Sequence, residues 1–387
     1  MKTVAQDPTE DAFVQNPYAF YDELRGLGDL VFWDEYDMPM AHSHKVVSSL
    51  LRDRRFGRKN PMEVPPAPHT QPFYEIEAHS MLERDPPCHT RLRGLVLRAF
   101  TSRRIAGLQP EIQALCHDLI DQFPRDPFDL LTAYATPIPA ITIARLLGVP
   151  EIHVSELLNW SNAMVMMYQA RRTYADEVAA SDAATEFAAF LTDYIDHRRK
   201  IPADDLITHL IGAEEHGETL STAELISTCI LLLNAGHEAT VHSIGNGVKH
   251  CLETGCRPSA DPAPFAEEVL RLDPPLHVFM RYASEDVDVF GHSFAKGQQV
   301  GLILASANHD PSAFEAPSEF RPGRASPTHA SFGGGIHFCV GAPLARLELG
   351  LALNTLFERC PNLRLDAPPR YAPNYHFHGL SELRVSL

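Results

Sequence analysis

The sequence predicts a mainly α-helical protein with a small β-sheet region. Long apolar-rich stretches free of proline, above all residues 179–200 and 223–250, predict the helices. Short apolar runs such as residues 30–33 predict strands. The hydrophobic share of 44% is ample for a large core, and no Gly/Ser linker or internal repeat divides the chain. We therefore expect one domain over residues 1–387.

The N-terminal part of the chain predicts a short helix, strands and a long loop. Residues 16–28, NPYAFYDELRGLG, fit a short helix that ends in glycine, and residues 30–33 then fit a strand. Residues 61–87 are dense in proline. A loop of that length inside a compact domain is usually functional or disordered.

A helix is predicted from His89 to about Phe100. His89 and Arg93 are four residues apart and share the face that also carries apolar residues. A His/Arg pair on such a face is expected where both side chains reach an anionic group. Arg91 and Arg98 align on the opposite face. Two interpretations of these two arginines stay open, a solvated surface and a docking patch.

The middle of the chain predicts further helices over residues 112–123, 141–147 and 179–200. Between the last two lies a methionine-rich stretch, residues 160–168. Such a stretch either packs into a core or lines a binding site, and core packing is the commoner outcome.

Residues 223–250 predict a long apolar helix with polar residues in its middle. Farther along the chain, residues 264–271 predict a helix that Pro274 ends, and Glu268 and Arg271 face the same way on it.

The stretch from Ser331 to Glu348, SFGGGIHFCVGAPLARLE, combines a glycine loop, one cysteine and a helix start. Pro343 suits the first turn of a helix. Cys339 therefore precedes a helix N-terminus, where the helix dipole favours a thiolate. A thiolate in this setting is suited to ligate haem iron.

Charge and cysteine content narrow the function classes. A formal net charge of −17 argues against non-specific binding to nucleic acid or anionic membranes. The seven cysteines are an odd, scattered set, unlike a secreted disulfide framework. The sequence has no uninterrupted apolar stretch of the length that a membrane span needs.

The string Phe332-Gly333-x-Gly335-x-His337-x-Cys339-x-Gly341 resembles the haem-binding signature of the cytochrome P-450 superfamily of haem-thiolate monooxygenases. The resemblance implies the cytochrome P-450 fold and haem b as cofactor. It assigns Cys339 as the iron ligand, places Phe332 beside the thiolate and pairs His337 with a haem propionate. Gly341 completes the motif.

Three other motifs of the family occur in the expected order. His89 and Arg93 resemble its propionate-binding HxxxR pair, and Arg281 resembles a third propionate ligand. Glu268 and Arg271 match the ExxR motif, a buried structural pair, and Arg324 fits the arginine that meets it.

The long helix over residues 223–250 resembles the family's distal helix, in which Ala235 and Gly236 approach the haem. Glu238 matches the acidic residue of the proton-delivery pair. Most members follow this acid with a threonine, whereas this chain has Ala239 there and Thr240 one place later. Thr240 could substitute if the helix is widened at that point. Ordered water or a substrate hydroxyl are the other candidates.

The family's pocket regions indicate which residues contact substrate. Residues 375–379 fit a hairpin turn that reaches the pocket, or else carry surface histidines. The candidate pocket residues are Phe73, Tyr74, Met81, Leu82, Met164, Met167, Leu232, Leu276, Val278, Phe279 and Phe377.

The resemblance implies a monooxygenase that inserts one oxygen atom from O2 into a small or medium organic substrate, by hydroxylation or O-demethylation. An acidic ferredoxin with an NAD(P)H-dependent reductase would supply electrons, docking on Arg91, Arg98, Arg103 and Arg104. The altered residue at Ala239 leaves open a peroxide-driven peroxygenase, and a non-catalytic haem sensor is a further alternative. Without the anchor of microsomal relatives, we expect a cytoplasmic, bacterial-type monomer.

Overall fold

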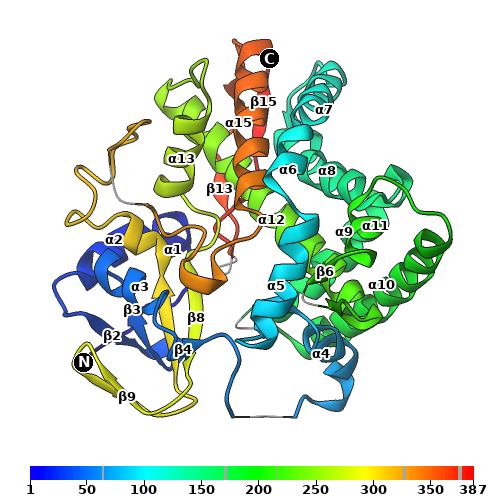
Figure 1. Ribbon diagram of the computed structural model, residues 1–387. Helices are drawn as coiled ribbons and strands as arrows, with labels where there is room; N and C mark the ends of the chain where they lie inside the picture. The colour runs from blue at the N-terminus through cyan, green and yellow to red at the C-terminus, as the bar shows by residue number, and fades with distance from the viewer. Residues whose placement is uncertain (63–64, 170–171, 216, 326–327, 374–376) are drawn as a thin grey trace. The chain divides into compact units, whose positions relative to one another are not determined.

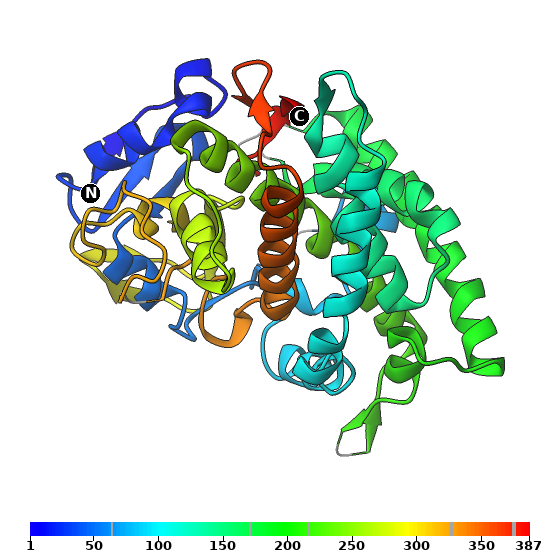
Figure 2. The same ribbon diagram turned by 90° about the horizontal axis from the view of Figure 1, so that it is seen from above.

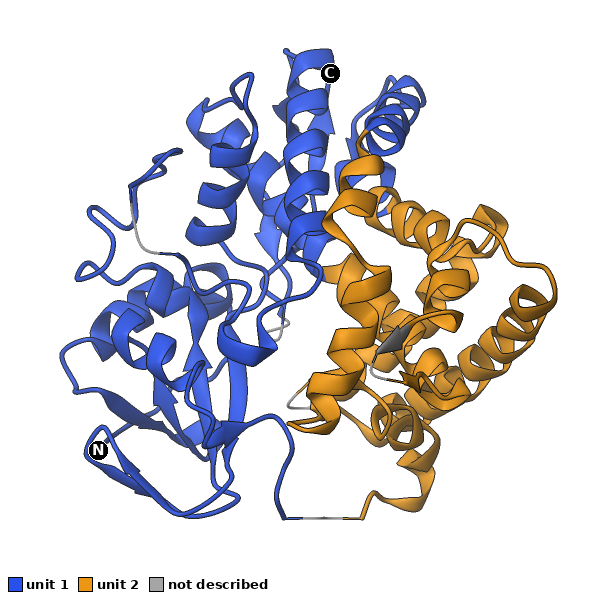
Figure 3. Ribbon diagram, in the orientation of Figure 1, with its two compact units in different colours: residues 1–62, 110–136, 239–387 blue, residues 63–109, 137–238 orange. Residues whose placement is uncertain are grey.

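The computed structural model describes residues 1–62, 65–169, 172–215, 217–325, 328–373 and 377–387. The chain forms two compact units, and each unit is assembled from segments that are far apart in the sequence (Figure 3). Unit 1 contains residues 1–62, 110–136 and 239–387, and unit 2 contains residues 63–109 and 137–238. That the whole chain is one domain stays a prediction.

Unit 1 holds most of the β-structure and the C-terminal helices. Its helical elements, of which α7 begins one residue ahead of the unit, are α1 (Asp11–Gln15), α2 (Pro17–Leu24), η1 (Asp34–Tyr36), α3 (His44–Leu50), α7 (Gln109–Asp121), η4 (Leu131–Ala135), α13 (Ala263–Leu272), α14 (Leu304–Asn308), η7 (Gly335–His337) and α15 (Ala342–Arg359). Its strands are β1 (Lys2–Val4), β2 (Leu30–Trp33), β3 (Met38–Ala41), β4 (Phe56–Gly57), β5 (Phe128–Asp129), β8 (Val278–Ala283), β9 (Val287–Val289), β10 (His292–Phe294), β11 (Gln299–Ile303), β12 (Arg364–Leu365), β13 (Arg370–Tyr371), β14 (Leu380–Glu382) and β15 (Arg384–Ser386).

The largest sheet of unit 1 has six strands in the order β1-β2-β3-β11-β8-β4. Figure 1 labels four of them, β2, β3, β4 and β8. Two of its pairings, β1 with β2 and β3 with β11, are parallel, and the others are antiparallel. Strand β8 pairs with β11 over five residues, from Gln299↔Tyr282 to Ile303↔Val278. This ladder fixes the stretch on which Val278, Phe279 and Arg281 lie.

Both faces of this sheet are buried at β2 and β11, where successive residues point to opposite faces and join different hydrophobic clusters. In β2, Leu30 belongs to one hydrophobic cluster and Val31 to another. In β11, Leu302 and Ile303 divide in the same way. A strand that is buried on both faces reads as a continuous apolar run, and this explains the sequence of residues 30–33.

Helices α13 and α15 of unit 1 contact each other and lie side by side in both views (Figure 2). Helix α15 carries Pro343 in its first turn, as the sequence predicts. The longest helix, α12 (Thr222–Thr254), belongs to both units, since unit 2 ends at Glu238 and unit 1 resumes at Ala239.

Unit 2 is almost entirely helical. Besides the first half of α12 it contains η2 (Pro68–Thr70), α4 (Gln71–Glu77), η3 (Met81–Glu83), α5 (Cys88–Ala99), α6 (Ser102–Gly107), α8 (Pro137–Leu147), η5 (Glu151–His153), α9 (Val154–Val165), η6 (Met166–Tyr168), α10 (Tyr174–Lys200), α11 (Leu206–Ile211), β6 (Glu214–Glu215) and β7 (Glu218–Thr219). Among the helices of the described residues, none is long and apolar enough to cross a membrane.

The mainly α fold class is confirmed, and one local expectation needs correction. The proline-dense stretch 61–87 is not a plain loop, because its described part contains η2, α4 and η3. Pro68 and Pro72 stand at the starts of η2 and α4, where a missing N–H costs nothing. The proline content therefore marks helix starts as well as loop.

Candidate active site

Cys339 lies between a tight glycine loop and the start of α15. Gly333 and Gly335 have φ angles of +69° and +65°, which L side chains rarely adopt. A Cβ at Gly335 would also lie 2.5 Å from the backbone oxygen of Leu51. The backbone N–H of Cys339 donates to the oxygen of Phe332 at 3.0 Å, which closes the loop. Gly333 and Gly335 are therefore required by the backbone path.

Cys339 is the only exposed cysteine of the seven, all of which lie within the described residues. Burial raises the pKa of Cys116 to about 11 and those of Cys229 and Cys251 to about 12, so these three are neutral thiols. Cys339 is thus placed where an external group can meet its sulfur. A soft, accessible sulfur at a helix start fits the axial ligand of a haem iron.

Other predicted residues of unit 1 lie close to this loop. A Cβ at Gly333 would lie 3.0 Å from the Phe279 ring, so this candidate pocket residue packs against the cysteine loop. Phe332 is buried, and the guanidinium of Arg346 lies 4.5 Å from its ring centroid. Gly341 is the N-cap residue of α15. It lies beside Cys339, since a Cβ at Gly341 would be 3.8 Å from the sulfur of Cys339.

Two basic side chains of unit 1 were predicted to bind haem propionates. Arg281 is on β8 and only 1% exposed, and its Nη1 donates to the oxygen of Met280 at 2.8 Å. His337 ends the short helix η7 and is half-buried. A buried arginine needs an anionic or carbonyl partner. The pair is suited to carboxylate groups, and the role stays a prediction.

Glu268 and Arg271 form a buried ion pair on α13. Nε and Nη2 of Arg271 donate to Oε2 and Oε1 of Glu268 at 2.9 and 2.8 Å. Arg324 Nε donates to the same Oε1 at 2.8 Å, and so does the backbone N–H of Arg321. Burial alone would raise the pKa of Glu268, but the hydrogen bonds from Arg271 and Arg324 outweigh it and lower the pKa. Glu268 is therefore held as a carboxylate.

The candidate pocket residues of unit 1 include a pair from distant segments. Leu276 and Phe377 form an isolated antiparallel β-bridge. Phe377 is buried, whereas Leu276 and Val278 are half-buried. The expected hairpin over residues 375–379 falls partly outside the described residues, which resume at Phe377.

Helix α12 is regular around the altered threonine position. Residues 222–254 are continuously α-helical, without the widened turn that Thr240 would need to replace a threonine at position 239. The side chain of Thr240 is buried and that of Ala239 half-buried. On a regular helix the two side chains point about 100° apart. The widened helix turn that would let Thr240 take the place of a threonine at position 239 is therefore absent from α12.

The part of α12 in unit 2 carries the acidic candidate. Ala235 is exposed, Gly236 and Glu238 are half-buried, and Leu232 is buried. A Cβ at Gly236 would meet only Ile143, at 3.9 Å, so packing within unit 2 does not require this glycine. Ala235, Gly236 and Glu238 thus form the more open stretch of a mostly buried helix.

His237 was missed by sequence reasoning. Its Nε2 lies 3.2 Å from Oδ1 of Asn162, and its Nδ1 lies 3.3 Å from the oxygen of Leu233. The contact with Asn162 joins α12 to α9, and His237 directly precedes Glu238 in the chain. A signal was present, because a buried histidine inside an apolar helix needs a polar partner. The partner itself could not be inferred from the sequence.

The His/Arg pair of α5 is placed as expected along one face. His89 is 2% exposed and Arg93 is half-buried. On the opposite face, Arg91 bonds to Glu224 and Glu218 of the same unit.

A further correction concerns the predicted positive patch. Arg104 bonds to Asp204 at 2.5 Å, and Arg91 is paired as described above. The net positive charge expected at these two arginines is therefore compensated within unit 2. Arg98 and Arg103 are exposed.

The remaining candidate pocket residues lie in unit 2 and are mostly buried. Asn234 Nδ2 lies 3.9 Å from the sulfur of Met164, so this methionine packs against α12. Phe73, Met81, Met164 and Met167 are at most 6% exposed, whereas Leu82 is half-buried and Tyr74 is 39% exposed.

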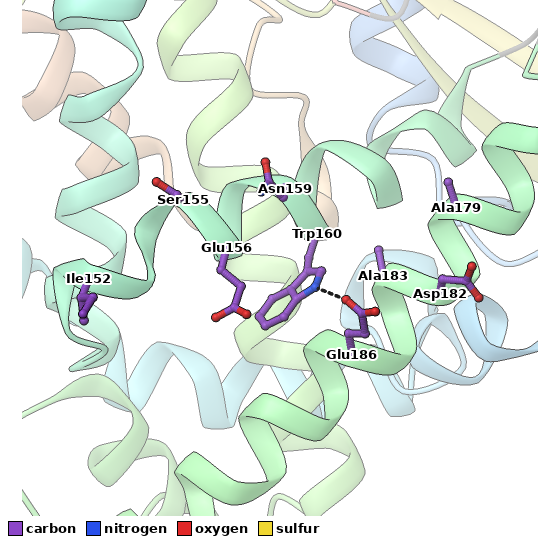
Figure 4. A pocket seen from close by; sticks show the side chains of 9 residues that line it. All are labelled: Ile152, Ser155, Glu156, Asn159, Trp160, Ala179, Asp182, Ala183 and Glu186. Atoms are coloured by element: carbon purple, nitrogen blue, oxygen red, sulfur yellow. Dashed lines mark hydrogen bonds between the residues drawn. The ribbon is translucent and has the colours of Figure 1, made fainter.

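A surface hollow of about 680 Å³ on unit 2 is a different place from these candidates (Figure 4). It lies between α9 and α10, and Trp160 in it donates from Nε1 to Glu186 at 2.8 Å. It is lined by Ile152, Ser155, Glu156, Asn159, Trp160, Ala179, Asp182, Ala183 and Glu186. No predicted site residue is among them, so the hollow is not the expected substrate pocket.

Comparison with known proteins agrees with the fold. Residues 265–372 match the family model "Cytochrome P450". The chain is 34% identical to the biotin biosynthesis cytochrome P450 of Bacillus subtilis (strain 168), covering 99% of both chains. It is 36% identical to the cytochrome P450 monooxygenase PikC of Streptomyces venezuelae, covering 96% of this chain and 91% of that one.

Among solved structures, P450BioI in complex with a hexadec-9Z-enoic acid ligated acyl carrier protein superposes with a TM-score of 0.91. The identity is 34%, and the match covers 98% of this chain and 100% of that one. The chain therefore belongs to the cytochrome P450 family, and it is an oxidoreductase of that family. Membership implies a haem-thiolate cofactor.

Proposed function

We propose that this protein is a monooxygenase that inserts one oxygen atom from O2 into a C–H bond of a small or medium organic substrate. The reaction consumes two electrons and two protons and releases water. Insertion into a methoxy carbon would lead to O-demethylation. The observation that carries the proposal is the accessible Cys339 in a glycine loop at the start of α15.

In this proposal Cys339 would ligate the haem iron. Arg281, His337, His89 and Arg93 would bind the propionates through charge-assisted hydrogen bonds. Haem, when bound, supplies the activation of dioxygen. The protein contributes the thiolate, the exclusion of water and the delivery of protons.

Glu238 is the candidate for holding and passing protons from solvent. Its half-buried carboxylate lies on the open stretch of α12, one turn from Ala235. His237 is its neighbour in the chain and is tied to Asn162, so it helps to fix the direction of this turn. The residue after Glu238 supplies no hydroxyl.

The absence of a hydroxyl at Ala239 leads to a prediction about substrate coupling. Because α12 is regular here and Thr240 is buried, we expect a hydroxyl on the substrate itself to complete proton delivery. General acid help is worth roughly 10²–10⁴ in rate. A substrate with oxygen near its reacting carbon should couple donor oxidation to product, and its deoxygenated analogue should release mostly peroxide.

Two variants, each assayed with both substrates, test this account. Ala239→Thr should partly restore coupling with the deoxygenated analogue, and Thr240→Ala should leave coupling with the natural-type substrate intact. The measurement is product formed per donor oxidised, with peroxide quantified in parallel. If Thr240→Ala uncouples both substrates while the analogue couples normally in the unaltered protein, Thr240 is the relay instead.

An acidic ferredoxin with its NAD(P)H-dependent reductase is the proposed electron donor. Arg98 and Arg103 are one candidate docking place for it. The basic segment 52–59, RDRRFGRK, in unit 1 is a second. A Cβ at Gly334 would lie 3.7 Å from the guanidinium carbon of Arg52, so this exposed arginine borders the cysteine loop. Arg54 is also exposed.

Charge reversal separates the two candidate docking places. Electrostatic steering raises association rates by roughly 10–10³ and weakens with salt. We expect the double variant Arg52→Glu and Arg54→Glu to slow reduction by the ferredoxin at least about tenfold. Reversal of Arg98 and Arg103 serves as the comparison. The matched control reverses Arg125 and Lys296, two exposed cations elsewhere in unit 1.

Peroxide-driven turnover provides the internal check, because it needs no donor. It should be unchanged in all these variants. Unchanged reduction kinetics in both test variants would contradict electrostatic docking on either place. Equal loss of both activities would indicate misfolding.

The second candidate function is a peroxygenase, which the alanine at position 239 favours. Turnover with reduced donor and O2, measured against turnover with peroxide alone, distinguishes it from the monooxygenase. A haem sensor would turn over under neither condition.

A further inference from the structure

Leu276 and Phe377, which form the isolated β-bridge, are each followed in the chain by a buried histidine. His277 is 0% exposed and His378 is 5% exposed. Side chains alternate across an extended segment, so these histidines point away from the side of Leu276 and Phe377. The carboxylate of Asp273 lies beside them. We propose that Asp273, His277 and His378 bind a divalent transition-metal ion of the zinc type.

The three ligand atoms are already close together. One ring nitrogen of each histidine and one carboxylate oxygen of Asp273 all lie within 4.8 Å of one another. The two imidazole centroids are 4.4 Å apart, and Nε2 of His378 lies 3.4 Å from Oδ1 of Asp273. Zinc bonds to nitrogen and oxygen are about 2.0–2.2 Å long. Small side-chain adjustments therefore suffice to close three bonds on one ion.

Tyrosines hold the proposed ligands from outside. Tyr21 Oη lies 2.9 Å from Nδ1 of His277, so the proposal takes Nε2 as the ligand atom. Tyr18 donates to Oδ1 of Asp273 at 3.0 Å, and Tyr371 donates to Oδ2. Metal-binding imidazoles and carboxylates are usually oriented by outer hydrogen bonds of this kind.

The backbone segments that carry the ligands are fastened together. The N–H of His378 donates to the oxygen of Pro275 at 2.7 Å. Asn246 of α12 donates from Nδ2 to the oxygen of His378 at 3.0 Å and to that of Asp273 at 3.3 Å. The cluster is therefore preorganised by unit 1, and little ordering is left to the ion.

The chemistry of the ligand set indicates which ion would bind. Two nitrogen ligands and one carboxylate favour Zn²⁺ or a neighbouring ion over Mg²⁺ and Ca²⁺, which take oxygen ligands. Water would complete a tetrahedral shell.

The test measures zinc binding by the haem-containing protein after treatment with a chelator. In equilibrium dialysis against micromolar Zn²⁺, the unaltered protein should bind one more equivalent of zinc per chain than His378→Gln or His277→Gln binds. The matched control is His209→Gln, which removes an exposed histidine whose Nε2 lies 3.0 Å from Asp204. This control should bind as much zinc as the unaltered protein. Tyr21→Phe, which removes an outer hydrogen bond, should weaken binding roughly 10–100-fold.

A second readout guards against variants that fold poorly. Zinc should raise the thermal midpoint of the unaltered protein and of His209→Gln, by mass action on the folded state. It should raise the midpoint less in Tyr21→Phe. The proposal is overturned if all variants bind zinc with equal strength. It is also overturned if the unaltered protein binds no zinc at a free zinc concentration of about 100 times the Kd of the expected micromolar site. The second result would leave Asp273 and His378 as a hydrogen-bonded pair only.

Discussion

Replacing Cys339 with serine is expected to abolish the red-shifted Soret band of the reduced, carbon monoxide-bound protein. The band requires a thiolate ligand, and a serine oxygen lacks the soft electron donation of sulfur. Because Cys339 is the only exposed cysteine, no other side chain of this type can take its place at the loop. Monooxygenase activity should be lost with the band.

The matched control for this experiment is Cys256→Ser. Cys256 is half-buried and lies far along the chain from the glycine loop. Its replacement should leave the spectrum and the haem content unchanged. A thiolate-type band that survives in Cys339→Ser would show that the ligand assignment is wrong.

Replacing Glu268 with glutamine is expected to destabilise the folded protein by about 3–5 kcal/mol, the usual cost of breaking a buried ion pair on one side. The variant leaves Arg271, with a side chain only 3% exposed, without its carboxylate, and Arg324 loses the same acceptor. The measurement is the free energy of unfolding in denaturant. Glu319→Gln is the control, because Glu319 meets Arg321 at the surface, and it should change nothing measurable.

The ionisation of Glu268 also determines how the stability of the folded protein should depend on pH. The pKa of Glu268 is lowered in the folded state, so its stabilisation is complete above the ordinary carboxyl pKa of about 4.3 and is lost as pH falls through the folded value. The unaltered protein should therefore lose stability in acid more steeply than Glu268→Gln. Parallel acid profiles, or a variant as stable as the unaltered protein, would show that Glu268 does not anchor the fold.

The cysteine loop could be predicted from the sequence because its determinants are local. Positive φ angles at Gly333 and Gly335, and a proline in the first turn of α15, are properties of neighbouring residues. The close contact between Gly335 and Leu51 could not be foreseen, because it depends on how distant segments pack. The sequence therefore predicts the chemistry of the loop but not its support.

Charge partners were predictable from helix periodicity only where they were close in the chain, and the partner Arg324 of Glu268 was predicted from the family resemblance. Glu268 and Arg271 share a helix face, so their pairing follows from periodicity. Arg91 meets Glu224, which is 133 residues away, and the helix periodicity of residues 89–100 holds no information on that partner. The same limit explains why the His237–Asn162 contact was missed.

The Glu268 network has a consequence for how the chain can change. Arg271 donates to the backbone oxygens of Asn308 and Pro317, and Arg324 donates to that of Ala316. At residues 316 and 317 the connection that follows α14 is thus held through main-chain oxygens, which every amino acid possesses. The side chains at these two positions can change in evolution without loss of these hydrogen bonds to the arginines of the Glu268 network.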